Sequence, residues 1–186
     1  MTDAAPTKEI ILFADPMCSW CWGFSPVMGA LAEAYGDSAR LSLVLGGLRP
    51  GTTKAMDEDD KEEVRHHWED VARTTGQSFT YTFFERDGFV YDTEPACRAA
   101  VTVRGLAPEK AFAYLDALHH AFYIEDRDIT DGAVLADVAD ALGVEAQAFT
   151  AAFDADAVIA RTQADFQMAH ELGIRGYPTV MLKDDG

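Results

Sequence analysis

The sequence predicts an α/β protein in which a helical insertion separates the strands of a small sheet. Residues 8–14 and 40–45 are short apolar runs typical of strands, and they flank a helical pattern over residues 18–35. A third strand-like run, residues 179–182, follows only near the end of the chain. Strands joined through one helix lie parallel, with a right-handed crossover. The first three segments are therefore expected to form a β-α-β unit that the distant third strand completes.

Each element of the β-α-β unit is bounded by residues that end it. Residues 8–14 (KEIILFA) form an apolar run that stops at an Asp-Pro pair, as expected for a buried strand. The helical pattern that follows ends at Gly36, a residue type favoured just beyond the C-terminus of a helix. Residues 40–45 (RLSLVL) are again strand-like, and a Gly-Gly pair closes them.

The middle of the chain is predicted to be helical. Thr93 and Pro108 mark helix starts, because Thr caps a helix N-terminus and Pro lacks the N–H that a first turn leaves free. Either Thr130 or Asp131 caps a later helix. Residues 79–92 are aromatic and irregular, and are expected to cover the core of the insertion. The expected helices span residues 53–75, 93–105, 108–123, 131–143 and 145–153.

The chain is predicted to return to the sheet near its end. Residues 156–172 form a helix that Gly173 stops, and residues 179–182 form a strand. A hairpin turn follows at residues 183–186 (KDDG), and a returning strand is expected beyond it, since the third strand would otherwise be an unpaired edge. The predicted parts are an N-terminal sheet part, the insertion and a C-terminal sheet part, with bounds 1–52, 53–153 and 154–186.

The amino-acid composition argues against some classes of binding partner. The 186 residues suit one domain, and a hydrophobic content of 48% supports a sizeable core. The 15 Lys and Arg against 32 Asp and Glu give a net charge of −17. This balance argues against nucleic acid or an anionic membrane as a partner, because both need clustered cations. The N-terminus lacks the apolar core of a secretory signal and no segment suits a membrane span, so a cytoplasmic location is expected.

Two of the three cysteines form the most informative motif, Cys18-Ser19-Trp20-Cys21. It follows a predicted strand and opens a predicted helix, where free amides and the positive end of the helix dipole favour a thiolate. Cys18 is therefore the expected nucleophile, and Cys21 the resolving thiol that closes an intramolecular disulfide. A metal site needs about four ligands, for which only Cys97 and five histidines remain, so no metal is predicted. An inert buried pair is the other alternative.

Further segments give the motif a family context. The cysteine pair after the first strand, with Pro26 beyond it, and residues 173–179 (GIRGYPT) resemble the thioredoxin fold, with its cis-proline segment. The helical insertion, with residues 15–24 (DPMCSWCWGF) and 93–99 (TEPACRA), resembles the DsbA-like family. Within it, the segments are most similar to cytoplasmic bacterial proteins described as disulfide isomerases. The resemblance covers nearly the whole chain and implies a thioredoxin fold with an α-helical insertion, but the chain lacks the family's final strand and helix.

The resemblance also implies a function and further site residues. It implies a thiol–disulfide oxidoreductase or disulfide isomerase that acts on protein or peptide clients and is recycled by a thiol system. No cofactor is implied, although glutathione is a candidate co-substrate. Pro178 is expected in the cis form beside the cysteines, while Tyr177 offers its backbone to an extended substrate. An ordinary trans turn proline is the alternative.

The neighbours of the cysteines each have two interpretations. Trp20, Trp22 and Phe24 form an apolar rim that binds substrate, or two of the three pack against the insertion. Asp15 is a buried proton relay to the resolving thiol, or a solvated turn residue. The two residues between the cysteines influence the reduction potential, but they match neither DsbA nor thioredoxin, so neither potential transfers.

Cys97 and the paired histidines are interpreted as structural. Cys97, near the start of an insertion helix, is expected to be a small buried hydrophobe, with a third redox thiol as the alternative. Neighbouring histidines, His66-His67 and His119-His120, point about 100° apart on a helix and chelate one metal poorly. Surface positions or satisfied core positions are therefore expected for them.

Two other functions remain open. Glutathione transferases of the kappa class and 2-hydroxychromene-2-carboxylate isomerases resemble this architecture and bind glutathione at the same place. They typically carry Ser where Cys18 stands, so the intact pair weighs against them. A chaperone that uses the aromatic rim without turnover is the non-enzymatic alternative, and its activity would survive Cys18→Ala.

Overall fold

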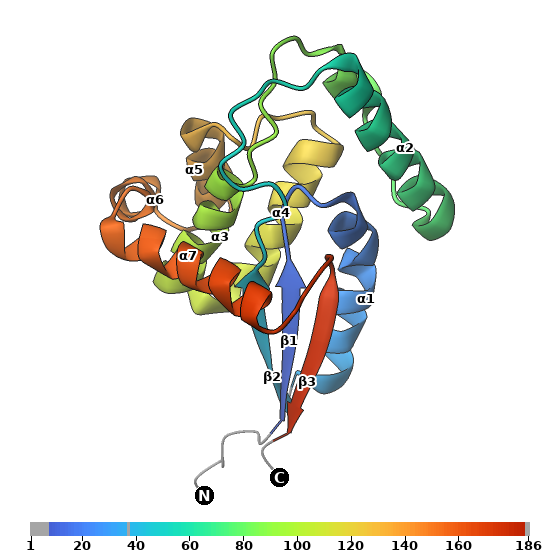
Figure 1. The fold of residues 1–186 in the computed structure, drawn as a ribbon. Helices are drawn as coiled ribbons and strands as arrows, with labels where there is room; N and C mark the ends of the chain where they lie inside the picture. Colours follow the sequence, from blue (N-terminus) through green and yellow to red (C-terminus); the bar gives the residue numbers. More distant parts are fainter. Residues whose placement is uncertain (1–7, 37, 185–186) are drawn as a thin grey trace, which may run out of the picture.

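The computed structural model describes residues 8–36 and 38–184 and contains a sheet of strand order β2-β1-β3 (Figure 1). The strands are β1 (Lys8–Ala14), β2 (Ala39–Leu45) and β3 (Thr179–Asp184). β1 and β2 are parallel and joined through α1 (Ser19–Tyr35), whereas β3 pairs antiparallel with β1. The predicted α/β class and the parallel β-α-β unit are thus confirmed.

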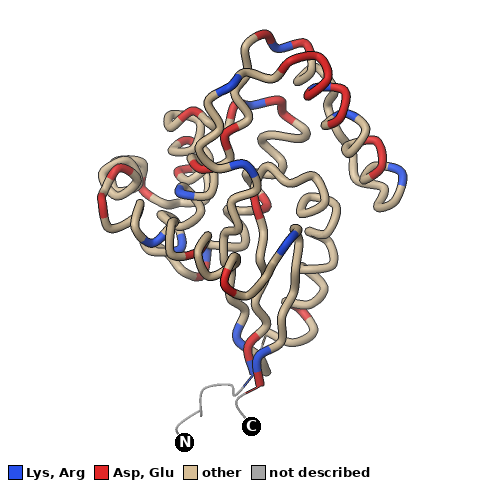
Figure 2. Tube along the Cα trace, in the orientation of Figure 1, with Lys and Arg blue, Asp and Glu red and all other residues tan. Residues whose placement is uncertain are grey.

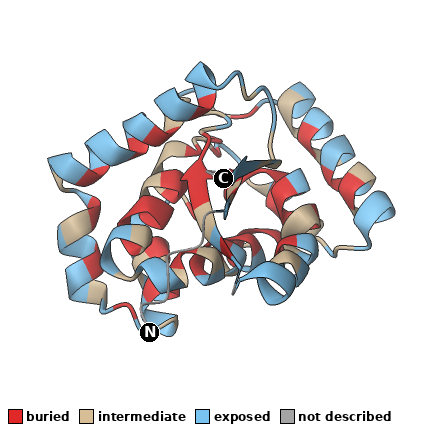
Figure 3. Ribbon diagram, turned by 90° about the horizontal axis from the view of Figure 1, so that it is seen from below, coloured by how far each residue is buried: buried red, intermediate tan, exposed pale blue. Residues whose placement is uncertain are grey.

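The two faces of the sheet pack against different elements. Because side chains alternate along a strand, Leu12 and Leu43 share one face, in the core that includes residues of α1 and the insertion. Phe13 and Val44 lie on the other face, which α7 (Asp156–Glu171) covers. Seen from below, the buried positions lie at the centre of the molecule and on the inner sides of the helices, while the outer sides of the helices are exposed (Figure 3). Strand β3, at the edge of the sheet, has no buried residue. The sheet therefore sits between helical layers.

The insertion between β2 and α7 has an aromatic core. Its helices are α2 (Glu58–Thr75), α3 (Glu94–Leu106), α4 (Ala111–Tyr123), α5 (Gly132–Ala141) and α6 (Ala146–Phe153), with short 3-10 helices at Tyr81–Glu85 and Pro108–Lys110. Trp68 of α2 is buried at its centre. Its ring centroid lies 4.8–6.2 Å from those of Phe79, Tyr81, Phe83, Phe84, Phe122 and Tyr123. The aromatic segment thus supplies much of this core, as expected.

A bidentate ion pair fixes the insertion to the sheet. Arg104 of α3 donates to both carboxylate oxygens of Asp165 in α7, over 2.7 and 3.0 Å. The same guanidinium also donates to the carbonyl of Leu43, and Asp165 accepts from the backbone N–H of Leu45. Two parallel N–H···O bonds give such a pair a defined geometry. The pair and these two backbone contacts tie α3, α7 and β2 together.

The first insertion helix begins later than predicted. It starts at Glu58 and not at residue 53, because Asp57 is its N-cap and accepts from the backbone N–H of Asp60 over 3.0 Å. Asp60 returns the contact by accepting from the N–H of Asp57, which completes a capping box. Residues before this cap are drawn away from the helix, since Ala55 forms an isolated bridge with Val90.

The structure refines two other predicted helix starts and decides between the alternatives at a third. Thr93 stands at the start of α3, but its hydroxyl accepts from the N–H of Arg49 and does not cap the helix. Pro108 opens a 3-10 turn before α4. Asp131, and not Thr130, caps α5, by accepting from the N–H of Ala133 over 2.8 Å. A tertiary hydrogen bond engages the Thr93 hydroxyl elsewhere, and a local hydrogen bond selects Asp131 over Thr130.

The predicted hairpin turn at residues 183–186 is only partly covered by the structure. Residues 183 and 184 continue β3 and pair with β1, so they do not form a turn. Residues 185 and 186 lie outside the described part of the chain.

Charge and hydropathy fit a molecule with a polar exterior. Figure 2 shows acidic positions along α2 and scattered over the other helices. Among the residues that the structure describes, no helix has the length and apolar character required to cross a membrane.

Candidate functional site

The two cysteines lie where β1 ends and α1 begins. Cys18 is the N-cap residue of α1, with an extended backbone, and its N–H donates to the carbonyl of Asp15 over 3.1 Å. The N–H of Cys21 donates in turn to the carbonyl of Cys18 over 2.9 Å, which sets the two thiols one turn apart. Both are free thiols and both are buried, with exposures of 6% and 4%. The strand-turn-helix junction therefore holds both cysteines, each largely shielded from solvent.

The loop before β3 meets this pair. The Cys18 thiol donates to the carbonyl of Tyr177 over 3.3 Å, although 159 positions separate the two residues. The peptide bond between Tyr177 and Pro178 is cis. The phenol of Tyr177 donates to the carbonyl of Gly46 over 2.7 Å, and burial raises its pKa to about 12, so the phenol stays a donor at neutral pH. The structure thus brings Cys18, Tyr177 and Pro178 together.

Cys21 is the more deeply protected thiol. Burial raises its pKa well above the ordinary value of a cysteine, and the neighbouring Cys18 thiol raises it further. At neutral pH Cys21 is therefore a neutral thiol. It needs a base before it can act as a nucleophile.

Asp15 is fully buried, so its interpretation as a solvated turn residue is wrong. One carboxylate oxygen accepts from the N–H of Met17 over 2.8 Å, and the other from the N–H of Leu48 over 2.6 Å. Burial raises the pKa of Asp15, and these two backbone contacts offset part of that rise. A carboxyl group that binds its proton more tightly than usual thus lies directly before the cysteine turn.

Cys97 contacts this carboxylate, which the sequence analysis did not foresee. Its thiol donates to Asp15 over 3.4 Å, and its side chain is completely buried. Burial, followed by the charge of Asp15, raises the pKa of Cys97 well above its ordinary value. Cys97 is therefore a buried neutral thiol, as expected for a small core residue, but one hydrogen-bonded to an acid. No spacing pattern signals this contact, because 82 positions separate the two residues.

The two tryptophans near the cysteines have different surroundings. Trp20 is 38% exposed, whereas Trp22 is 8% exposed and stacks on Tyr123 with an interplanar angle of 10°. The indole N–H of Trp22 donates to the carbonyl of Ser78 over 3.1 Å. Trp20 is therefore accessible from solvent, whereas Trp22 is not. Trp22 instead anchors α1 to the insertion, as its alternative interpretation held.

An outer groove of about 230 Å³ opens beside Cys18. It is lined by Met17, Cys18, Ser19, Trp20, Leu48, Arg49, Val64, His67, Trp68, Tyr91, Gly176 and Tyr177. Several of these residues, Arg49 and Tyr91 among them, were missed by the sequence analysis. The groove combines the Cys18 thiol, an exposed indole and a cation.

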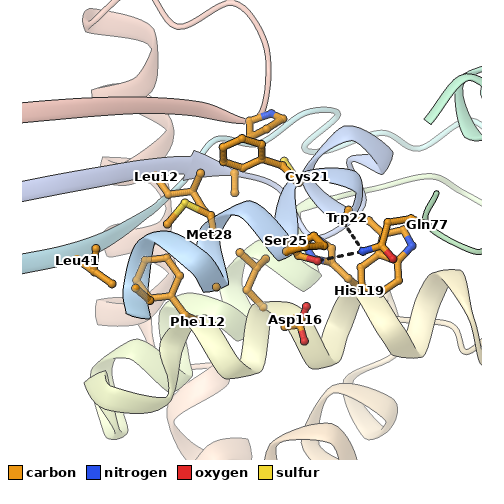
Figure 4. A pocket seen from close by; sticks show the side chains of 17 residues that line it. Leu12, Cys21, Trp22, Ser25, Met28, Leu41, Gln77, Phe112, Asp116 and His119 are labelled. Carbon is orange, nitrogen blue, oxygen red and sulfur yellow. Dashed lines mark hydrogen bonds between the residues drawn. The ribbon is translucent and has the colours of Figure 1, made fainter. Parts of the chain in front are cut away.

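An inner cavity of about 360 Å³ reaches the other cysteine (Figure 4). It is bordered by α1, α4 and the sheet, and its lining is largely apolar, with Cys21, Met28 and Leu115 among the contributors. At one end Gln77 donates to the carbonyl of Trp22 and to the hydroxyl of Ser25 (Figure 4). Cys18 therefore borders the outer groove, and Cys21 borders a separate apolar space.

The histidines divide into surface and core positions. His66, His67 and His120 lie at the surface of their helices, whereas His119 is buried in α4. Burial lowers the pKa of His119 to about 4, so its ring is neutral at pH 7. Within the described part of the chain neither ring nitrogen has a hydrogen-bond partner, so the expectation of a satisfied core histidine is wrong for His119. No group of three or more metal-ligating side chains occurs among the described residues.

Most of the chain is similar to one known protein family and to several solved structures. The family described as DSBA-like thioredoxin domain matches residues 9–186. A candidate protein disulfide isomerase from Nitrosomonas europaea is 37% identical with a TM-score of 0.90, and the match covers 95% of this chain and 85% of that one. The cytosolic disulfide reductase DsbM from Pseudomonas aeruginosa is 27% identical with a TM-score of 0.78, covering 95% and 89% of the two chains. Its structure with GSH is 29% identical with a TM-score of 0.76, covering 92% and 84%.

The curated relatives are longer and more distant. The ClpXP adapter protein SpxH of Bacillus subtilis is 23% identical, and that of Shouchella clausii is 25% identical. These matches cover 92% and 98% of this chain but only 57% and 61% of the two relatives. The chain thus spans less than two thirds of their length.

Proposed function

Because the chain belongs to the family of DSBA-like thioredoxin domains, we propose that it is a thiol–disulfide oxidoreductase acting on protein or peptide disulfides. One observation carries the proposal. The Cys18 thiol stands at a helix N-terminus, within hydrogen-bond distance of the carbonyl before a cis-proline, with Cys21 one turn behind it. A helix N-terminus favours a thiolate, and the carbonyl belongs to a backbone segment that a bound peptide can pair with.

The bonds that form and break in the reduction of a client lie among the two cysteines and the client disulfide. The Cys18 thiolate attacks one sulfur of the client disulfide, forms a mixed disulfide and releases the other client sulfur as a thiolate, which takes up a proton. Deprotonated Cys21 then attacks Cys18, closes the internal disulfide and releases the second client thiol. Two electrons pass from the protein pair to the client, and an external thiol returns them in the next cycle.

The first test measures the fraction of Cys18–Cys21 disulfide across a glutathione redox series, by thiol trapping and mass. We expect a single two-electron transition within the range from about −270 mV, the thioredoxin value, to about −120 mV, the DsbA value. A midpoint near the lower value indicates a reductase, and one some 100 mV higher indicates an oxidase or isomerase. Absence of the disulfide at every potential would refute the proposed function.

We further propose that Asp15 accepts the proton of Cys21 in the second step. Its buried carboxyl directly precedes the cysteine turn, and its negative charge is close enough to Cys21 to raise the pKa of that thiol. Because its own pKa is raised, Asp15 becomes a base only above that raised value. The rate of resolution should therefore increase with pH as Asp15 ionises.

Asp15→Asn is expected to slow resolution at pH 7 at least about tenfold, since general-base catalysis contributes roughly 100-fold or more. The rate should recover at high pH, where hydroxide deprotonates Cys21 directly. Stopped-flow release of the client thiol from a preformed mixed disulfide at Cys18 measures the step between pH 5 and 10. Asp116→Asn is the matched control, because that carboxylate borders the same inner cavity as Cys21 but is exposed. An unchanged pH profile in Asp15→Asn would contradict the relay.

Glutathione is the proposed recycling thiol, and the cytosol the proposed location. A structural neighbour named a cytosolic disulfide reductase is also known with GSH, which supports both proposals. The competing transferase function predicts conjugation of glutathione to an electrophile without any change in the redox state of Cys21. A conjugation assay with the Cys21→Ala variant separates the two functions.

A second candidate function is binding of a protein partner without turnover. The curated relatives are named adapter proteins, and the exposed Trp20 beside the groove offers an apolar contact. Such binding would survive Cys18→Ala, whereas oxidoreductase activity would not.

A further inference from the structure

Arg49 is a cation without a carboxylate partner at the outer groove. Its guanidinium carbon lies 5.4 Å from the centroid of the Tyr91 ring. Within the residues that the structure describes, the guanidinium makes no hydrogen bond or ion pair. No Asp or Glu lines the groove, although the chain has 32 acidic residues. The guanidinium therefore borders a groove whose lining contains no acidic side chain.

The position of Arg49 is well defined. Its N–H donates to the hydroxyl of Thr93 over 3.1 Å, and its carbonyl accepts from the hydroxyl of Thr52 over 2.9 Å. The Tyr91 ring below it is buried, and the Tyr91 hydroxyl donates to the carbonyl of Met17 over 2.7 Å. The stacking surface is thus anchored to the turn that leads into the cysteines.

The acids next to Tyr91 and Thr93, two residues that Arg49 contacts, are engaged elsewhere. One carboxylate oxygen of Asp92 accepts from the N–H groups of Gly51 and Glu94, over 2.7 and 3.0 Å. The carboxylate of Glu94 pairs with Arg98 over 3.0 Å. A guanidinium stacked on an aromatic ring keeps its N–H edges free for a planar, bidentate partner. Arg49 is therefore available to an anion that enters the groove from outside.

We propose that Arg49 binds a carboxylate of a small peptide disulfide while Cys18 attacks its sulfur. The inference rests on the proposed function and specifies its substrate class. The groove volume of about 230 Å³ lies below the roughly 300–1,000 Å³ of most ligand pockets. A groove of this size favours a single cysteinyl residue with a nearby carboxylate over a folded segment of a protein client. The reduced pair gives two electrons to the disulfide, and two small thiols leave.

Single-turnover reduction of two glutathione disulfides tests the proposal. One has free carboxylates, and in the other all carboxylates are ethyl esters. Arg49→Gln should lower the second-order rate constant for the free acid about tenfold, which corresponds to about 1.4 kcal/mol, and change that for the ester less than twofold. Arg65→Gln is the matched control, because Arg65 also stacks on an aromatic ring, at 4.5 Å from the centroid of Phe84, but does not line the groove.

A binding measurement keeps this inference separate from the proposed function. S-methylglutathione cannot exchange, and calorimetry should detect its binding to the wild type and to Cys18→Ser but not to Arg49→Gln. Equal slowing of both disulfides by Arg49→Gln would overturn the proposal, since Arg49 would then act on Cys18 itself. Equal binding of S-methylglutathione and its diester would also overturn it. If no Cys18–Cys21 disulfide forms at any potential but S-methylglutathione still binds in an Arg49-dependent way, only the oxidoreductase function is refuted.

Discussion

Cys21→Ser is expected to leave the protein covalently attached to its clients. Cys18 can still attack a disulfide in this variant, but the second thiol that would release the client is missing. Mixed disulfides at Cys18 should therefore accumulate, visible as adducts on non-reducing gels and by mass. Cys18→Ser removes the nucleophile and should reduce dithiol activity at least about 1,000-fold, because knockout of a catalytic nucleophile has effects of this size or larger.

Cys97→Ala is the control that makes these two variants informative. Cys97 is completely buried and hydrogen-bonded to Asp15, so we expect it to change the rate of resolution only modestly and to leave adduct formation intact. A loss of activity in Cys97→Ala as large as that in Cys18→Ser would assign the redox chemistry to a different pair. Absence of adducts in Cys21→Ser would contradict the order of attack.

The parts of the fold that local chemistry determines were predictable from sequence. Only residues 15–17 separate β1 from the cysteine motif that opens α1, and β2 follows soon after the helix, so this order favours a parallel β-α-β unit. The start of α2 is predicted too early because four residues, 53–56, that a helix could accept precede its cap. Only the reciprocal contact of Asp57 and Asp60 selects residue 58.

The parts of the site that depend on distant contacts were not predictable from spacing. The motif pointed to Cys18 and Cys21, and the family resemblance pointed to Tyr177 and Pro178. Nothing in the pattern signalled that Cys97 would donate to Asp15, or that Arg49 would stack on Tyr91. These contacts arise because α3 and the loop after β2 pack behind the cysteine turn, which is a consequence of tertiary structure alone.

Gly46→Ala is expected to disable the site without touching a cysteine. A Cβ atom at this position would lie 2.0 Å from two ring carbons of Tyr177 and 2.5 Å from its hydroxyl oxygen. The ring would have to move, the hydrogen bond from its phenol to the Gly46 carbonyl would break, and the loop that carries the Tyr177 carbonyl would shift away from Cys18. A misplacement of about 1 Å at a reacting group can lower a rate about 100-fold, and we expect a loss of this size in client reduction. Overpacking of this kind also destabilises by about 1–3 kcal/mol.

Two variants separate displacement of the loop from general damage. Gly29→Ala lies in α1, where the added methyl meets no atom within 4 Å, so it should retain full activity and gain about 0.5–1 kcal/mol of stability. The double variant Gly46→Ala, Tyr177→Ala removes the ring that the methyl would strike. Because the Tyr177 carbonyl belongs to the backbone, it can then return to Cys18, and activity should recover at least about tenfold relative to Gly46→Ala. If the double variant stayed as inactive as the single one, the Tyr177 side chain would not be what transmits the change, and Gly46 would act on Cys18 by another route.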